Sequence, residues 1–260
     1  MNKVQGKSLK QNFFVYMLRN LMMMVTPIII FPYASRVLGV DGVGKVQFAQ
    51  TTATYFELIA QFGIKSYAIR EGVKIRDDRE KFGKFITELF IINICTDAVA
   101  VITYLAAVFH AGSLQSYKGL LMIFLLEVIF SGLSFEWFYS ILEDYVYITI
   151  RTTVFQMLSL LTMLVFAHKE TDLSVYAIAL VLPYVGDSIT NIFHSRKLVK
   201  LFGYKNYALK KHAKAMFFIF SIILSTSLYT MMDTTMLGRM QGDTATGLYS
   251  AASKLKRLSV

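Results

Sequence analysis

The sequence predicts an all-α integral membrane protein, built as a six-helix N-terminal lobe followed by the first one and a half helices of a repeated second lobe. Hydrophobic residues make up 55% of the 260-residue chain, and the mean hydropathy is +0.50. A soluble domain of this composition would lack the polar residues needed to cover its surface. Long apolar stretches alternate with short basic ones, as expected of membrane spans and their loops. A segment that crosses lipid must satisfy its backbone hydrogen bonds internally, which favours helices.

Seven stretches of the chain are long and apolar enough to cross a bilayer, which takes about 20 residues of helix. An eighth begins near Thr246. The first stretch follows Lys3, Lys7 and Lys10, as the apolar part of a signal peptide would, but its length and the spans after it indicate an uncleaved first span. The seven predicted spans are residues 13–38, 43–64, 85–109, 119–140, 146–167, 173–194 and 214–237.

The distribution of charge indicates on which side the loops lie. The net charge is +10, but the basic residues occur in blocks between apolar runs, which favours cytoplasmic loops and argues against nucleic-acid binding. The chain up to Arg19 holds four lysines and arginines, residues 65–84 hold seven, and residues 196–214 hold seven. The N-terminus is therefore expected in the cytoplasm. We divide the chain at the third block, into an N-terminal transmembrane lobe of residues 1–207 and the start of a second, truncated lobe at residues 208–260.

The segment from Thr26 to Gln61 joins the first two spans and organises the lobe. Pro27 and Pro32 each remove a backbone hydrogen bond from a helix interior, and Gly39 lies in the corner between the two spans. We expect a bend in the first span. Pro27, Pro32 and Gly39 are candidate hinge residues for alternating access, and a static kink that serves the packing of the lobe is an equal alternative.

One face of the second span is polar. Six polar side chains recur every three or four residues, which is the spacing of a single helix face. They could hydrogen-bond to neighbouring helices, but a stripe of six that includes the carboxyl group of Glu57 favours a water-filled cavity. With two further residues outside this stripe, the candidate cavity residues are Arg36, Gln47, Gln50, Thr51, Thr54, Glu57, Gln61 and Asp233.

A second copy of this segment occurs near the C-terminus. The residues from Thr246 to Lys254 match those from Val43 to Thr51 at a constant offset of 203 residues. A period of this length indicates a repeated lobe and not a solenoid. The offset adds Ser250, Ser253, Lys254 and Arg257 to the candidate cavity residues. The two cations either face water or a partner inside the membrane, or mark the early end of a short span.

The sequence shows no constellation of residues for catalysis. It lacks a phosphate-binding loop and a His-Glu-x-x-His zinc motif, and its four histidines lie at span ends or in loops. The single cysteine, Cys95, lies in an apolar run, where we expect a small buried side chain and not a metal ligand or a disulfide partner. We therefore expect no catalytic residue, no metal site, no cofactor, and a protein that is not an enzyme.

Two shorter segments also predict local structure. Between Lys65 and Lys84, oppositely charged residues such as Arg76 and Glu80 lie four apart, which predicts a short cytoplasmic helix that leads into the third span. An aromatic cluster ends the fourth span, and we interpret it as an anchor at the membrane surface. Its members are Phe135, Trp137, Phe138 and Tyr139.

Four patterns in the chain occur in the same order as in a known family, and together they cover nearly its whole length. They are Pro32 to Gly39 with Gly42 and Gly44; Gly63 to Asp78 through Tyr67, Arg70 and Glu71; Trp137 to Tyr139 with Glu143, Asp144 and Arg151; and Leu228 to Gly238 through Asp233, with Gly247 and Tyr249 to Ala252. On these residues the chain resembles the bacterial polysaccharide transporters, which are O-antigen-type flippases of lipid-linked oligosaccharides in the superfamily that also holds multidrug exporters. It departs from the family at Ile141 and Gln156, where Gly and Lys are common, and in length, since the family has two six-helix lobes.

The resemblance implies a flippase in the bacterial cytoplasmic (inner) membrane that moves undecaprenyl-diphosphate-linked repeat units from the cytoplasmic to the periplasmic leaflet, for O-antigen or capsule synthesis. Two lobes would rock about a central cavity while the lipid tail stays in the bilayer, and Lys254 and Arg257 would help to hold the diphosphate. The implied partners are the lipid bilayer, the lipid-linked oligosaccharide, a polysaccharide polymerase and chain-length proteins. A cation-coupled multidrug exporter and an integral-membrane glycan polymerase are the alternative functions.

Overall fold

Helices are the regular structure of the chain wherever the computed structural model describes it, at residues 9–195 and 203–256. The all-α fold class is therefore confirmed for these residues. In chain order the elements are α1 (Leu9–Gln61), α2 (Ile64–Ile75), α3 (Arg79–His110), the 3-10 helix η1 (Gly112–Tyr117), α4 (Lys118–Gly132), α5 (Glu136–Ile141), α6 (Tyr145–Phe166), α7 (Leu173–Ser195), α8 (Leu209–Met240) and α9 (Asp243–Lys256).

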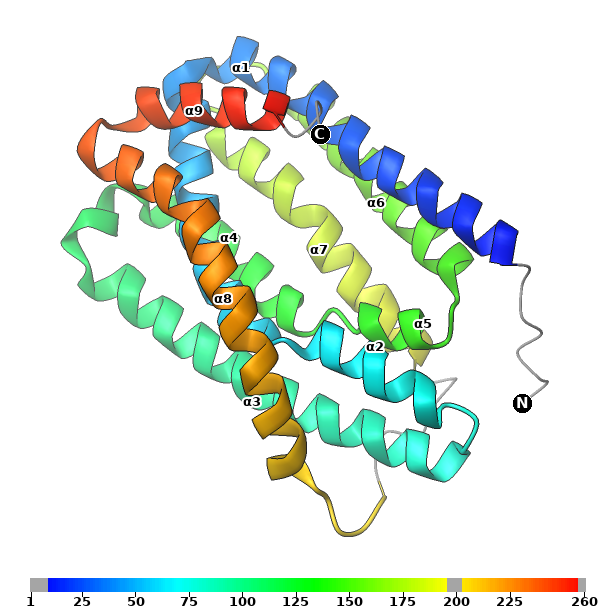
Figure 1. Cartoon of the computed structure of the whole chain (residues 1–260). Coiled ribbons are helices and arrows are strands. Elements are labelled where there is room, and N and C mark those ends of the chain that lie inside the picture. The colour runs from blue at the N-terminus through cyan, green and yellow to red at the C-terminus, as the bar shows by residue number, and fades with distance from the viewer. Residues whose placement is uncertain (1–8, 196–202, 257–260) are drawn as a thin grey trace.

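Figure 1 shows α1 running along α6 to one end of the molecule, turning there, and returning beside α4. The returning half packs on α3 and α4, and the α4–α7 and α6–α7 contacts complete the bundle. One apolar core fills this bundle around Ala53, Phe124 and Tyr104, and a second lies where α2, α3 and α5 meet. The α8 helix crosses the bundle diagonally, and α9 lies against the turn of α1 (Figure 1).

Six stretches of the described chain are long and apolar enough to cross a membrane, at residues 14–75, 79–110, 112–141, 145–166, 173–195 and 209–240. The first has 62 residues. A straight helix of that length would measure about 90 Å, three times the ~30 Å of a hydrocarbon core, so this stretch accommodates the first two predicted spans. The other five correspond to the third to seventh predicted spans.

The corner between the first two spans is a break inside α1 and not a loop. Helical backbone continues through Pro27 and Pro32, and Gly39 has the non-helical angles, with φ of 71° and ψ of 170°. Glycine adopts such a positive φ without steric cost. This break is the corner that we predicted between the first two spans, and the separate bend that we expect from the prolines within the first span stays a prediction. That any of the three residues acts as a hinge stays a prediction.

The fourth predicted span is two helices. It is interrupted after Gly132, and α5 begins after Phe135, which has a left-handed φ of 52°. The interpretation of the nearby aromatic cluster as a surface anchor is wrong, because its four rings are at most 2% exposed. Phe135 packs against the rings of Trp137 and Phe138, and Phe138 against that of Tyr139. The cluster is the centre of the second core.

The basic stretch after the second span forms a helix, as predicted, but with other bounds. α2 ends at Ile75 and α3 begins at Arg79, so a turn separates the residues that we expected to pair along one helix. Arg76 bonds instead to Glu143 at 2.6 Å. The side chain of Asp78 caps α3 by accepting a hydrogen bond from the backbone of Lys81 at 3.1 Å. Because Asp78 caps the first turn of α3, a new helix begins after it and α2 does not continue, which explains the turn between α2 and α3.

This cap predicts a dependence on pH at the start of α3. A hydrogen bond from the Lys81 ammonium group, followed by one from the Lys81 backbone N–H, lowers the pKa of Asp78. A lowered pKa gives a stabilising contribution that is present above the ordinary value of about 4 and is lost as the pH falls through the folded value. Amide exchange in the first turn of α3, corrected for its intrinsic pH dependence, should therefore accelerate in acid. Asp78→Asn should remove that acceleration, and an unchanged acceleration would contradict the assignment.

The outer faces of the spans are apolar. Ile102 is 66% exposed, Ile222 of α8 is 69% exposed and Tyr229 is 83% exposed. Cys95 is exposed as well, and our expectation that it is buried is wrong. Lipid is as apolar as a protein core, so a small hydrophobe such as cysteine gains nothing by facing inward there. The division of the chain at residue 207 stays a prediction, although α8 begins two residues later.

Candidate functional site

The corner of α1 and the corner between α8 and α9 contact one another reciprocally. A β-carbon added at Gly44 would lie 1.9 Å from the backbone oxygen of Asp243, and one at Gly247 would lie 2.3 Å from that of Val40. Only glycine permits so close an approach. The offset of 203 residues between the two sequence copies maps Gly44 onto Gly247 and Val40 onto Asp243. Each copy therefore presses its glycine against the same backbone position of the other, which is a two-fold symmetric contact.

Hydrogen bonds surround this glycine contact. Thr244 Oγ1 donates to Asp41 Oδ1 at 3.3 Å, and these residues are again 203 apart. The hydroxyl group of Tyr117 donates to Asp243 Oδ1 at 2.6 Å, and Lys45 pairs with Asp41 at 2.9 Å. Each such bond contributes about 0.5–1.5 kcal/mol net. Of these bonds, only those of Thr244 and Tyr117 reach across to the other corner, because Lys45 and Asp41 both belong to α1. The corner contact is thus held by weak bonds, which can break and re-form.

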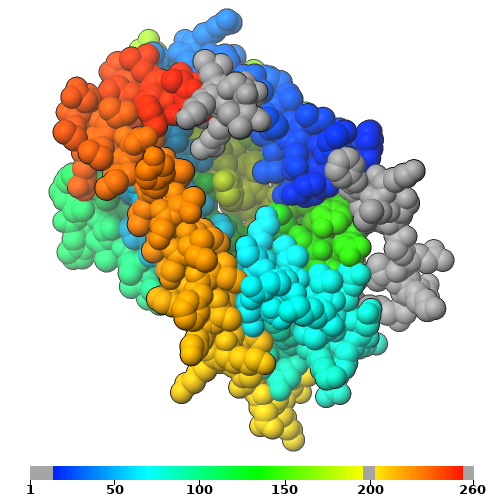
Figure 2. Space-filling view, in the orientation of Figure 1, coloured from blue at the N-terminus to red at the C-terminus, as the bar shows by residue number. Residues whose placement is uncertain are grey.

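Away from the corner, the surface is hollowed. Figure 2 shows the depression between α8 and the N-terminal half of α1, with α7 visible in its depth. The start of α8 is attached to the N-terminal lobe by buried hydrogen bonds, from Tyr67 Oη to His212 Nδ1 at 2.8 Å and from His212 Nε2 to Glu88 Oε2 at 2.9 Å. The helix that leads to the corner is therefore fixed at its other end to α2 and α3.

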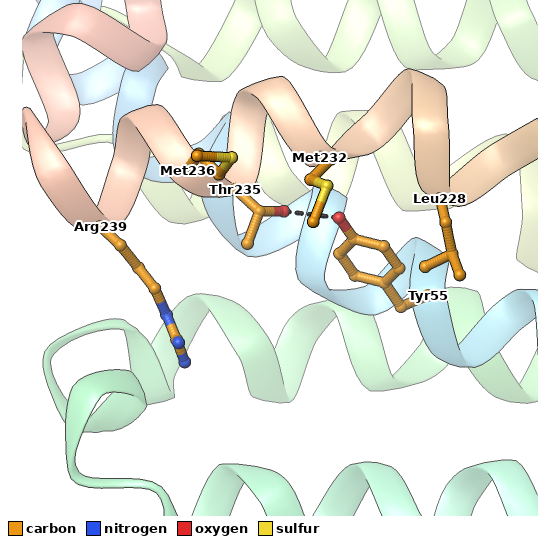
Figure 3. Close-up of a pocket in the computed structure, with 6 residues that line it drawn as sticks. All are labelled: Tyr55, Leu228, Met232, Thr235, Met236 and Arg239. Atoms are coloured by element: carbon orange, nitrogen blue, oxygen red, sulfur yellow. Dashed lines mark hydrogen bonds between the residues drawn. The ribbon is translucent and has the colours of Figure 1, made fainter.

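A seam joins the second half of α1 to α8. The hydroxyl groups of Tyr55 and Thr235 are 2.7 Å apart and bond across it, and Figure 3 shows Arg239 pointing away from this pair. The seam holds a small pocket with a mostly apolar lining. Its residues are Tyr55, Leu228, Met232, Thr235, Met236 and Arg239.

A cluster of charges shares one carboxylate where α1, α2, α5 and α6 come together. Glu136 accepts from Arg19 Nη2 at 3.0 and 3.1 Å and from Lys65 Nζ at 3.0 Å. Arg151 lies 3.7 Å from Glu136 and pairs with Asp187 at 2.9 Å. The side chain of Lys65 is 58% exposed, whereas that of Arg19 is 10% exposed. Three cations against two carboxylates leave an excess of positive charge, which suits an anionic group.

The predicted polar stripe of the second span lies in more than one environment. The Gln50 amide donates to Glu127 Oε1 of α4 at 3.4 Å, and Thr54 donates to the backbone oxygen of Gln50 at 3.0 Å. Part of the stripe therefore bonds within the lobe. Thr51 and Glu57 are buried, Gln47, Gln50 and Thr54 are half-buried, and Gln61 is exposed. Their role in lining a cavity stays a prediction.

The other candidates are distributed over α1, α8 and α9. Asp233 accepts a hydrogen bond from Tyr249 Oη at 2.6 Å, so it joins α8 to α9. The side chain of Lys254 and the whole of Arg257 lie outside the described residues. Arg36, Pro27, Pro32 and Asp233 are exposed, Gly39 and Ser253 are half-buried, and Ser250 is buried.

Sequence reasoning assigned no role in a site to three of the residues that the structure brings forward. Gly44 and Gly247 had a usable signal, because a glycine at the same position of two copies indicates a close backbone approach. Arg19 had none, since one basic residue near the start of a span is ordinary.

Comparison with known proteins identifies the family. A family model described as "Polysaccharide biosynthesis protein" matches residues 9–259. The chain belongs to this family. With its six stretches able to cross a bilayer, this polysaccharide biosynthesis protein is a multi-pass membrane protein.

Two similar proteins extend the comparison. A Shigella dysenteriae protein named "Putative O-antigen transporter" is 23% identical over an alignment of 240 positions, and the match covers 88% of this chain and 58% of that protein. A solved structure titled "protein A" has the same fold, with a TM-score of 0.67 and 16% identity over 97% of this chain and 62% of that one. The chain thus spans less than two thirds of the length of either.

Proposed function

We propose that the full-length protein is a flippase. It takes an undecaprenyl-diphosphate-linked oligosaccharide from the cytoplasmic to the periplasmic leaflet of the bacterial inner membrane, with its own N-terminus in the cytoplasm. Family membership supports a role in polysaccharide synthesis, and the curated relative is named for O-antigen transport. The protein moves its substrate and breaks no bond in it, so we assign no catalytic residue.

The reciprocal glycine contact is the observation that carries this proposal. A transporter that works by alternating access closes one side of the membrane while the other side is open. The contact between Gly44 and Gly247 closes the corner end, on the side where the few basic loops predict the periplasm. The hollow lies away from it, between α1 and α8 (Figure 2). The described conformation corresponds to the inward-facing state of the cycle.

The charge cluster suits the anionic end of such a substrate. Arg19 and Lys65 reach Glu136 from two helices, and Arg19 Nε has no hydrogen-bond partner among the described residues. A diphosphate accepts several charge-assisted hydrogen bonds and competes with Glu136 for these cations. A cationic drug, the substrate of the alternative exporter function, gains no partner in this cluster.

A deletion strain tests the function. Loss of the gene in its host should abolish surface polysaccharide and leave lipid-linked repeat units protected from a membrane-impermeant glycosidase, and the full-length protein should reverse both effects. Units that accumulate unprotected, on the periplasmic side, would indicate a polymerase. A strain with normal polysaccharide and lost drug resistance would indicate an exporter. Either result would contradict the flippase.

A further inference from the structure

Two carboxyl groups from different helices meet inside the N-terminal lobe. Glu57 of α1 and Glu127 of α4 are 5% and 1% exposed, and their carboxyl groups are close enough to hydrogen-bond to one another. Glu57 Oε1 and Glu127 Oε2 are buried and have no hydrogen-bond partner from the described residues when both groups are treated as acceptors.

The groups around this pair are donors without charge. The Gln50 amide donates to Glu127 Oε1 at 3.4 Å, and the phenol group of Tyr184 on α7 lies beside Glu127. Tyr104 of α3 is the other titratable side chain that faces the pair, and its hydroxyl group donates to a backbone oxygen. Within residues 9–195 and 203–256, no lysine, arginine or histidine pairs with either carboxyl group.

Such an arrangement accommodates a proton better than any other ligand. A carboxylate only accepts hydrogen bonds, so two adjacent carboxylates satisfy one another only when one of them is protonated. Two unpaired like charges in a buried site are costly. A metal cation needs several acceptor atoms, whereas Gln50 points a donor at the pair.

The pair lies on the same rigid element as the corner contact. Helical backbone is unbroken from beyond Gly39 to the end of α1, and Gly44 precedes Glu57 by thirteen residues, or about 20 Å of helix at 1.5 Å per residue. A change in how Glu57 packs against α4 therefore displaces the whole segment that ends in the corner.

We propose that Glu57 and Glu127 form a binding site for one exchangeable proton, and that its occupancy favours the closed corner. Proton loss leaves two like charges between α1 and α4, and their repulsion shifts the segment that holds Gly44. The coupling to export rests on the flippase function proposed above, whereas proton binding does not.

Proton binding is measured directly by infrared difference spectroscopy on the purified full-length protein. The wild type should show a carbonyl band of a protonated, buried carboxylic acid that disappears at alkaline pH. The measurement uses an Asp97→Asn background, because Asp97 is another buried carboxyl group on α3 and would contribute a band of its own. Glu57→Gln and Glu127→Gln should each shift the band of the pair, and the double substitution should remove it. A band that survives both glutamine substitutions would overturn the site. Because either variant alone is informative, poor folding of one does not decide the test.

Coupling is measured at the corner. Spin labels at Lys45→Cys and Leu248→Cys, equivalent positions of the two copies that are partly or largely exposed, report the corner distance in a Cys95→Ser background. The distance should lengthen at alkaline pH in the wild type and stay short in both glutamine variants. Coupling between sites typically amounts to about 5- to 150-fold, so export by these variants should fall about tenfold. A pH-dependent distance in both glutamine variants would overturn the coupling, whereas a failed flippase function would affect only the export result.

Discussion

Replacing Gly44 or Gly247 by alanine is expected to reduce surface polysaccharide export about 5- to 150-fold, the range of a coupling free energy of about 1–3 kcal/mol. The added β-carbon would lie 1.9 Å or 2.3 Å from a backbone oxygen of the other corner. A backbone oxygen cannot move aside by a change of rotamer, as a flexible side chain could. Overpacking of this kind costs about 1–3 kcal/mol, and only in the state where the corner is closed. The two substitutions should have similar effects because the contact is symmetric.

Membrane levels of the variants should be matched before export is compared. Gly119→Ala and Gly112→Ala are suitable controls, since nothing lies within 4 Å of a β-carbon added at either position, and both should export normally. Spin labels across the corner should report a longer distance in Gly44→Ala than in the wild type. Full export by Gly44→Ala with an unchanged distance would show that the corner does not gate transport.

Replacing Arg151 by leucine is expected to destabilise the N-terminal lobe by about 3–5 kcal/mol, because it leaves Asp187 as an unpaired charge in the protein interior. The side chain of Arg151 is 4% exposed. It donates to Asp187 at 2.9 and 3.2 Å and also bonds to the side chain of Asn191. These bonds connect α6 to α7 and help to fix the two helices relative to one another. Thermal unfolding of the purified protein in detergent measures the loss.

A second substitution distinguishes the loss of the Arg151–Asp187 ion pair from the cost of leaving Asp187 unpaired. Arg151→Leu combined with Asp187→Leu should recover part of the stability, since well-packed hydrophobes replace buried ion pairs at little cost. Lys81→Gln, which breaks an exposed pair with Asp78, should leave the unfolding temperature unchanged. A single variant, Arg151→Leu, as stable as the wild type would contradict the structural role of this pair.

Hydropathy was sufficient to predict the helices, because spans need long apolar runs and the number of such runs is readable from the chain. Their interruptions were harder to predict. The corner at Gly39 was expected, but nothing in the sequence indicated that helical backbone continues through Pro27 and Pro32. A membrane helix tolerates a missing hydrogen bond when its neighbours compensate, whereas a positive φ ends helical geometry at once.

The candidate site was only partly predictable, for a related reason. Helical spacing shows that polar residues share a face, but not which neighbour that face meets. Glu57 was singled out as a cavity residue, and the structure buries it against Glu127, which lies 70 residues away in the sequence. The aromatic cluster was likewise assigned to the membrane surface, because its composition suits a surface belt and a core equally. Long-range packing decides such cases, and it leaves no periodic signal.

The shared carboxylate at Glu136 also constrains the order in which this protein can change during evolution. Arg19 and Lys65 both depend on it, so losing Glu136 first would leave two cations without their common partner, one of them buried. Losing Lys65 first removes an exposed charge and leaves the bond between Arg19 and Glu136 intact. The effects of substitutions on stability do not add when the residues are in contact within one network. A protein that lacks only Lys65 should therefore be more stable than one that lacks only Glu136. On folding stability alone, Lys65 is therefore expected to vary before Arg19 and Glu136.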